Sequence, residues 1–111
     1  MAGLPPFSHL ALLRAEARSA AAARSFLRAA AEIAAAQPGS GEVALYPPVP
    51  ASVARIANVE RMQMLVESPS RVTLQRVLAQ WLPQLHALRA ERRGADERIL
   101  RWAVDVDPLS I

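Results

Sequence analysis

The chain has 111 residues, a length that fits one domain with a single core. It is 52% hydrophobic, which argues against a disordered chain. All 13 of its basic residues are arginine, and with 10 acidic residues they give a net charge of +3 that permits nucleic-acid contact without demanding it. The lack of cysteine excludes disulfides, Cys-ligated zinc and a cysteine nucleophile.

The first half of the chain predicts a strand, a helix and an edge strand. Residues His9 to Ala17 alternate imperfectly and predict the first strand. Ser19 to Gln37 is rich in alanine, has an apolar stripe at helical spacing and begins with a capping serine, so it predicts a helix. Glu42 to Val53 holds three prolines, which favours an edge or bulged strand. The extended pattern continues, with Asn58 as the best turn residue.

A strand, a sharp corner and a second helix follow. From Glu60 to Glu67 the residues alternate with the two-residue period of a half-buried strand. Ser68 and Ser70 are candidate N-cap residues around Pro69, which suits the first helical position. Helical spacing then continues to about residue 92, with Pro83 expected to kink or split the helix.

The last predicted strand runs from Ile99 to Asp107, with Trp102, Val104 and Val106 on its buried face. The resulting order, β-α-β-β-α-β, predicts an α+β fold of ferredoxin-like type, with an antiparallel sheet and both helices on one face. The other face of the sheet is expected to be a mixed polar surface of Arg14, Glu16, Arg61, Gln63, Arg101 and Asp105.

Most catalytic chemistry has no candidate in this sequence. There is no phosphate-binding P-loop and no lysine to complete one. His9 and His86 lack the neighbours of a metal site, and the pair Asp105 and Asp107 is more simply explained as solvated or capping carboxylates. No basic region followed by an apolar one opens the chain, and no apolar run approaches ~18 residues, so we expect no signal peptide, no membrane contact and a cytoplasmic location.

The start of the second helix is the best candidate for a binding site. Arg71 and Gln75 lie one turn apart beside the apolar stripe. A cation, an amide and free backbone N–H groups at a helix start favour an anion. The simpler alternative is a solvated or internally paired Arg71.

Several stretches together resemble a known family. They are LPPFSHLALLRAEA at the start, PVPA at 48–51, MQMLVESPSRVTLQRVL, and ILRWAVDVDP near the end. In this order and spacing they resemble the C-terminal domain of the PriA family of bacterial replication-restart helicases (primosomal protein N′). The resemblance extends over nearly the whole chain and makes it a single domain, 1–111, of a larger helicase, with residues 1–3 as an addition to it.

The resemblance implies a fold like that of ribosomal protein S10 and a non-catalytic role for this domain. ATP hydrolysis with Mg, and a zinc site, belong to the rest of the helicase, which acts on forked DNA and starts primosome assembly with PriB, DnaT and DnaB. The domain is expected to bind forked or single-stranded DNA, to pack against the helicase core and to bind the acidic C-terminal tail of the single-stranded DNA-binding protein, SSB. For that tail the family uses an arginine and a glutamine, which stand here as Arg71 and Gln75.

Candidate DNA phosphate contacts are Arg55, Arg61, Arg92 and Arg93, each of which is also readily explained as a solvated arginine. The second hypothesis is a purely structural module that braces a neighbouring domain. The mixed polar sheet face and the mild net charge are compatible with it.

Overall fold

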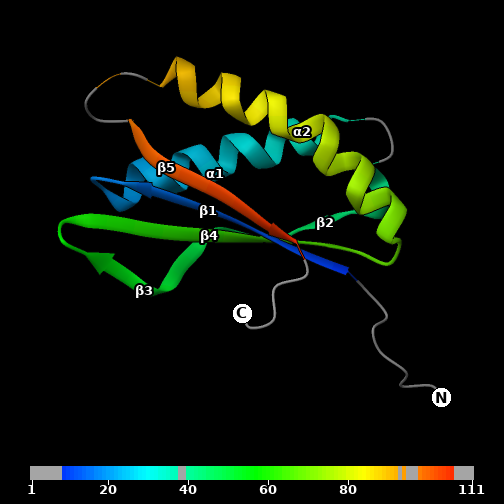
Figure 1. Ribbon diagram of the computed structural model, residues 1–111, viewed down its shortest axis with the longest axis horizontal. Helices are drawn as coiled ribbons and strands as arrows, with labels where there is room; N and C mark the ends of the chain where they lie inside the picture. Colours follow the sequence, from blue (N-terminus) through cyan, green and yellow to red (C-terminus); the bar gives the residue numbers. More distant parts are fainter. Residues whose placement is uncertain (1–8, 38–39, 93, 95–97, 107–111) are drawn as a thin grey trace.

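The computed structural model describes residues 9–37, 40–92, 94 and 98–106, without the side chains of residues 40 and 52–55. Its elements are β1 (His9–Ala17), α1 (Ala20–Ala35), a 3₁₀ turn η1 (Ser40–Glu42), β2 (Ala44–Leu45), β3 (Val49–Ile56), β4 (Val59–Ser68), α2 (Arg71–Glu91) and β5 (Ile99–Val106). The strands form one antiparallel sheet in the order β2-β4-β1-β5, with β3 also paired to β4. Both helices cover one face of the sheet and run antiparallel to each other (Figure 1). The predicted α+β, ferredoxin-like arrangement is confirmed.

Strand β1 lies in the middle of the sheet and organises the core. Leu13 faces Met64 of β4 on one side and Val104 of β5 on the other, and all three point toward the helices. Leu13 and Met64 are completely buried. The alanines of β1 at positions 11, 15 and 17 are also buried. Their small side chains let the helices approach the middle of the sheet closely.

Helix α1 begins where the sequence predicts. The hydroxyl of Ser19 caps it by accepting a hydrogen bond from the Ala22 N–H at 3.1 Å. Phe26, Leu27 and Ala30 are buried against the sheet and α2. No described helix is long and apolar enough to cross a membrane.

The edge of the sheet beyond β4 holds two strands where the sequence predicts one edge or bulged strand over Glu42 to Val53. Strands β2 and β3 both pair with β4, and the register of β3 shifts between Pro50 and Arg55. The hairpin from β3 to β4 turns at Ala57 and Asn58, which have φ angles of 50° and 66°. Two consecutive positive φ values are typical of a type I′ turn, so the prediction of Asn58 as the turn residue is confirmed.

Helix α2 differs in detail from the prediction. Its N-cap is Ser70, whose hydroxyl accepts from the Thr73 N–H at 3.1 Å, so Pro69 precedes the cap and the prediction that it opens the helix is wrong. Pro69 limits the conformation of Ser68 to the extended region, which ends β4. The helix continues unbroken past Pro83, and its axis bends near the middle (Figure 1), so the proline kinks α2 and does not split it.

The prediction for β5 is partly wrong. Trp102 and Val104 are half-buried against the core, but Val106 is 40% exposed. Because β5 is an edge strand and the helices lie mainly over β1 and β4, the far end of β5 is left uncovered. The exposed ring of His86 meets Trp102 edge-on, with ring centroids 4.9 Å apart.

The capping bond of Ser70 gives a stability prediction. We expect Ser70→Ala to lower the free energy of unfolding by about 1 kcal/mol, because the Thr73 N–H loses its acceptor. Urea denaturation followed by circular dichroism measures the change. Ser70→Asn keeps a capping oxygen and serves as the control; equal stability of the Ala and Asn variants would show that the cap contributes nothing.

Tyr46, the single tyrosine of the chain, gives a titration prediction. Its hydroxyl donates to Glu67 Oε1 at 2.5 Å, and this hydrogen bond, together with the negative charge of Glu67, raises the pKa of Tyr46. Because the folded state holds the phenol protonated, the contact stabilises the fold below the ordinary pKa of tyrosine, and this contribution is lost as the pH rises through the raised pKa.

Absorbance at 295 nm follows this titration without interference from another tyrosine. We expect Glu67→Gln to return the midpoint toward the ordinary value for tyrosine. An unchanged midpoint in that variant would rule out Glu67 as the cause.

Candidate functional site

The corner between β4 and α2, residues 68–75, is held by two serines. Ser68 is completely buried, and its hydroxyl accepts from the Ser70 N–H at 3.1 Å. Ser70 then caps α2, and its carbonyl accepts from the Leu74 N–H at 3.0 Å. These bonds set the direction in which the first turn of α2 leaves the sheet.

The start of α2 is less favourable to an anion than the sequence predicts. The N–H groups of Ser70 and Thr73 are already engaged. The Thr73 hydroxyl also donates to Glu42 Oε1 at 2.9 Å, which places a carboxylate beside the first turn. This contact comes from residues 31 positions apart, so no local pattern could have predicted it. Glu42 uses part of the positive potential of the helix end, and the guanidinium of Arg71 becomes the main attraction for an anion.

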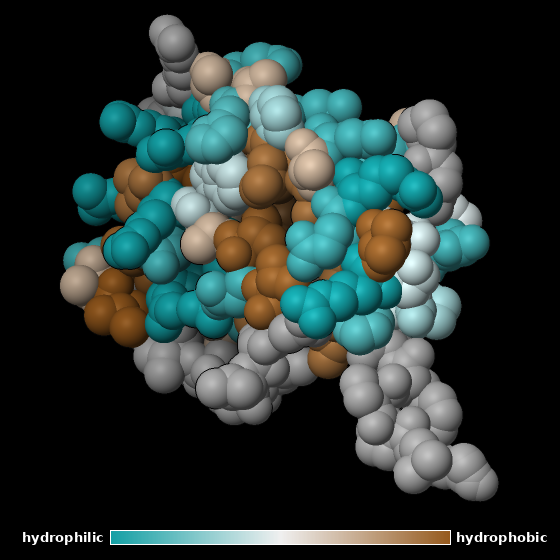
Figure 2. All heavy atoms as spheres, turned by 45° about the vertical axis from the view of Figure 1, so that its right-hand side comes forward, coloured by the Kyte–Doolittle hydropathy of each residue, from teal (hydrophilic) through white to brown (hydrophobic). Residues whose placement is uncertain are grey.

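Arg71 and Gln75 are both exposed and project from successive turns of α2. Within the described part of the chain, no hydrogen bond or ion pair occupies either side chain. Val72, between them in sequence, is 72% exposed. Figure 2 brings this end of the molecule forward and shows hydrophobic side chains among hydrophilic ones. The corner therefore offers a cation, an amide and apolar surface close together.

A second group of cations lies at the opposite end of the helical layer. Two adjoining hollows of about 450 and 390 Å³ share Arg92 as a lining residue. The arginines that line them are Arg24, Arg28, Arg89, Arg92 and Arg98, which we call the arginine surface. Glu32 is the one acidic residue among the described residues that line either hollow.

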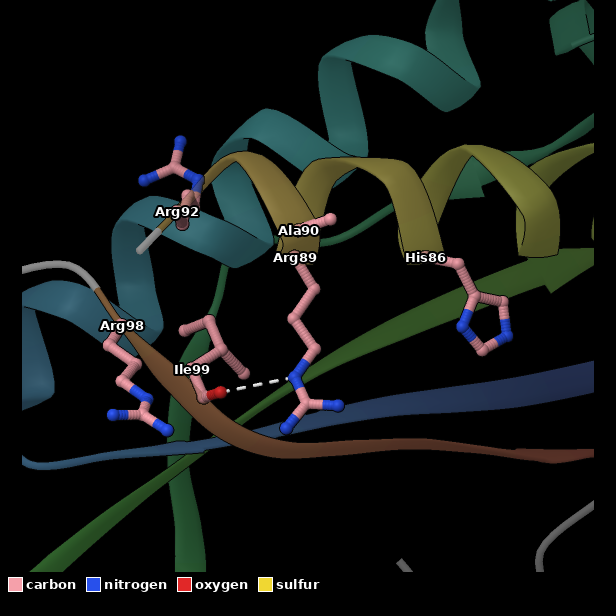
Figure 3. Close-up of a pocket in the computed structure, with 6 residues that line it drawn as sticks. All are labelled: His86, Arg89, Ala90, Arg92, Arg98 and Ile99. Atoms are coloured by element: carbon pink, nitrogen blue, oxygen red, sulfur yellow. Dashed lines mark hydrogen bonds between the residues drawn. The ribbon is translucent and has the colours of Figure 1, made fainter. Parts of the chain in front are cut away.

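Two members of the arginine surface connect separate elements. Arg89 reaches from α2 to β5, donating from Nε to the Ile99 carbonyl at 3.1 Å and from Nη2 to the Leu100 carbonyl at 2.8 Å (Figure 3). Arg92 turns the other way and donates to Ser25 Oγ of α1 at 3.0 Å. Arg89 keeps further N–H donors, so its guanidinium is held in place without losing its positive charge.

The four predicted DNA contacts fall in different places. Arg92 belongs to the arginine surface, and Arg93 and the side chain of Arg55 lie outside the described residues. Arg61 is on the sheet face away from the helices, where its Nε lies 3.6 Å from Glu16 Oε2. The assignment of these residues to DNA stays a prediction.

That open face of the sheet is balanced in charge. Arg14 forms an ion pair with Asp105, and Arg61 pairs with Glu16. The prediction of a mixed polar face is therefore confirmed. Asp107, the partner suggested for Asp105, lies outside the described residues, and among those described no group of three or more His, Asp or Glu side chains could hold a metal.

Sequence reasoning did not assign Arg24, Arg28, Arg89 or Arg98 to a site. The four-residue spacing of Arg24 and Arg28 on α1 was the available signal. It did not indicate that α1 and the end of α2 come together, because that depends on helix packing.

Comparison with known proteins agrees with this architecture. A chain titled "De novo designed protein Foldit4" superposes with a TM-score of 0.60 at 11% sequence identity, covering 91% of this chain and 97% of that one, which is a likeness of fold alone. "Replication restart protein PriA" of Haemophilus influenzae is 33% identical over 106 residues, or 96% of this chain. The chain spans 13% of the length of that protein.

The family described as "Primosomal protein N C-terminal domain" matches residues 1–109. With the α+β architecture and a PriA relative aligned along 96% of the chain, this match identifies the family. The chain belongs to the family of PriA C-terminal domains, which are part of a replication-restart protein.

Proposed function

We propose that this chain is the non-catalytic C-terminal domain of a PriA helicase and binds the phosphate backbone of DNA through the arginine surface. The observation that carries the proposal is the gathering of five arginines around two adjoining hollows: Arg24 and Arg28 of α1, Arg89 of α2, Arg92 at the C-cap of α2, and Arg98 beside β5. Five cations with one neighbouring carboxylate attract a polyanion far more strongly than the overall charge of +3 suggests.

The chemistry of this surface favours phosphate contacts over base reading. Guanidinium groups bind phosphate through paired N–H donors, and the arginine surface is built from them. Among the described residues lining its hollows, His86 is the only one with a ring, and that ring is already against Trp102. Stacking platforms for unpaired bases need several exposed aromatic side chains. Binding that is independent of sequence and sensitive to salt is the expected behaviour.

The salt dependence of single-stranded DNA binding tests the proposal. We expect the double variant Arg24→Ala/Arg28→Ala to bind an oligonucleotide more weakly at low salt and to reduce the slope of log K against log salt by about 1.4, because two phosphate contacts are lost. Fluorescence anisotropy between 50 and 200 mM salt measures both quantities.

The matched control is Arg61→Ala/Arg101→Ala, which removes two arginines from the open face of the sheet. It should leave the slope unchanged. The reverse pattern would move the DNA site to the sheet, as the prediction of Arg61 implies. Undetectable binding by the unmodified domain would favour the alternative of a purely structural module.

A second candidate function is binding of the SSB tail at the β4–α2 corner. The exposed Arg71 has no partner in the described part of the chain and lies beside Gln75 and the exposed Val72. A tail that combines acidic residues with a terminal apolar residue matches these groups: the guanidinium would hold a carboxylate, the amide would donate a hydrogen bond, and the apolar surface would receive the side chain. The nearby Glu42 opposes the acidic part of such a peptide.

Titration of an SSB-tail peptide against the labelled domain, followed by amide chemical shifts, tests this candidate. We expect shifts around Arg71 and Gln75 and about tenfold weaker binding in Arg71→Ala, the loss of one charge-assisted contact. Arg76→Ala removes another exposed arginine, on a different side of α2, and should bind like the parent domain. No shifts near Arg71 at millimolar peptide would exclude an autonomous tail site.

A further inference from the structure

The larger of the two hollows on the arginine surface lies where the end of α2 passes the start of β5. Its volume is about 450 Å³, and we call it the β5 hollow. Three arginines and a histidine line it (Arg89, Arg92, Arg98 and His86), and none of the described residues that line it is acidic. The neighbouring hollow, in contrast, includes Glu32. The β5 hollow is therefore the part of the arginine surface that favours the most highly charged anion.

Arg89 and Arg98 approach the β5 hollow from different elements. Arg89 belongs to α2, Arg98 directly precedes β5, and both residues are exposed. Figure 3 shows their side chains extending in the same direction on either side of Ile99, whereas the guanidinium of Arg92 turns away. The bonds from Arg89 to the carbonyls of Ile99 and Leu100 engage its Nε and Nη2, and they leave Nη1 without a partner among the described residues. The hollow is therefore lined by two accessible guanidinium groups, one of which is held in place.

The two kinds of phosphate in a nucleic acid differ in how well they match these donors. An internal phosphodiester has one negative charge and two free oxygens, whereas a phosphomonoester at the end of a strand has three free oxygens and a charge of about −1.5 to −2 at pH 7. Because one guanidinium engages two oxygens through parallel N–H donors, two guanidinium groups can engage all three oxygens of the monoester. The exposed imidazole of His86 adds a further donor.

We propose that the β5 hollow binds the terminal phosphate of a nucleic-acid strand, with Arg89 and Arg98 as the principal contacts and His86 as an additional donor. The inference rests on the proposed DNA-binding function and names the part of the strand that this hollow receives. A strand end is favoured over free phosphate because the β5 hollow adjoins the second hollow at Arg92, and the two arginines of α1 in that hollow are placed to receive an internal phosphate of the same strand.

Oligonucleotides of one sequence that carry a phosphate at the 5′ end, at the 3′ end or at neither end test the proposal. We expect the chain to bind one of the phosphorylated forms about tenfold more tightly than the form without a terminal phosphate, because one more charge-assisted contact is made. Fluorescence anisotropy of internally labelled oligonucleotides, at one salt concentration and near neutral pH, measures the three affinities.

Arg98→Gln isolates the contribution of the β5 hollow. Arg98 is exposed and forms no hydrogen bond or ion pair with another described residue, so the substitution should leave the fold intact. We expect the preference for the phosphorylated end to fall from about tenfold to below about threefold, because one of the two guanidinium groups is gone. The matched control is Arg28→Gln, which removes an exposed arginine of the second hollow. It should weaken binding of all three oligonucleotides equally and leave the preference unchanged.

Three results would overturn the inference and leave the proposed function standing. Equal binding of the three oligonucleotides would show that no site distinguishes a terminal phosphate. A preference that survives Arg98→Gln would place the terminal phosphate elsewhere. Saturation of the hollow by inorganic phosphate at concentrations below the Kd of the oligonucleotide, followed by the amide shifts of Arg98 and Ile99, would assign it to free phosphate. Undetectable binding of every oligonucleotide would instead remove the proposed function as well, so the two failures are distinguishable.

Discussion

The indole of Trp81 determines how the helical layer is assembled. It is completely buried between α2 and α1, and its Nε1 donates to the Ala30 carbonyl at 2.9 Å. A buried indole N–H needs an acceptor, and the carbonyl of a small residue on α1 is within reach only when the two helices lie close together at one relative position. This contact fixes which residues of α1 lie beside which residues of α2.

The relative position of α1 and α2 determines which residues meet at each end of the seam between them. Because α1 and α2 are antiparallel, the start of α1 meets the end of α2, where Arg24 and Arg28 join Arg92 around one hollow. At the other end of α1, Gln37 comes to lie beside Gln80 and Gln84. One end of the seam is therefore lined mainly by arginines, and the residues that line the hollow at the other end are uncharged.

The open face of the sheet and the β4–α2 corner show how tertiary ion pairs and hydrogen bonds change the charge of a surface that the sequence pattern predicts. The alternation of β1 and β4 predicted a polar face, and the sheet register then places Arg14 against Asp105 and Arg61 against Glu16. At the corner, the capping serine was predictable because it acts on the residue three positions on. The contact of Thr73 with Glu42 was not, since it depends on how η1 folds against α2.

Local sequence patterns predicted both helices, most of the strands and their approximate limits, and with them the α+β class, because hydrophobic periodicity, caps, prolines and turn residues act over a few positions. It also indicated the candidate pair Arg71 and Gln75, which are one helical turn apart. Which arginines gather on one surface and which are paired on the sheet is set by the tertiary structure alone. These depend on helix packing and strand register, which bring together residues far apart in the chain and leave no local trace in the sequence.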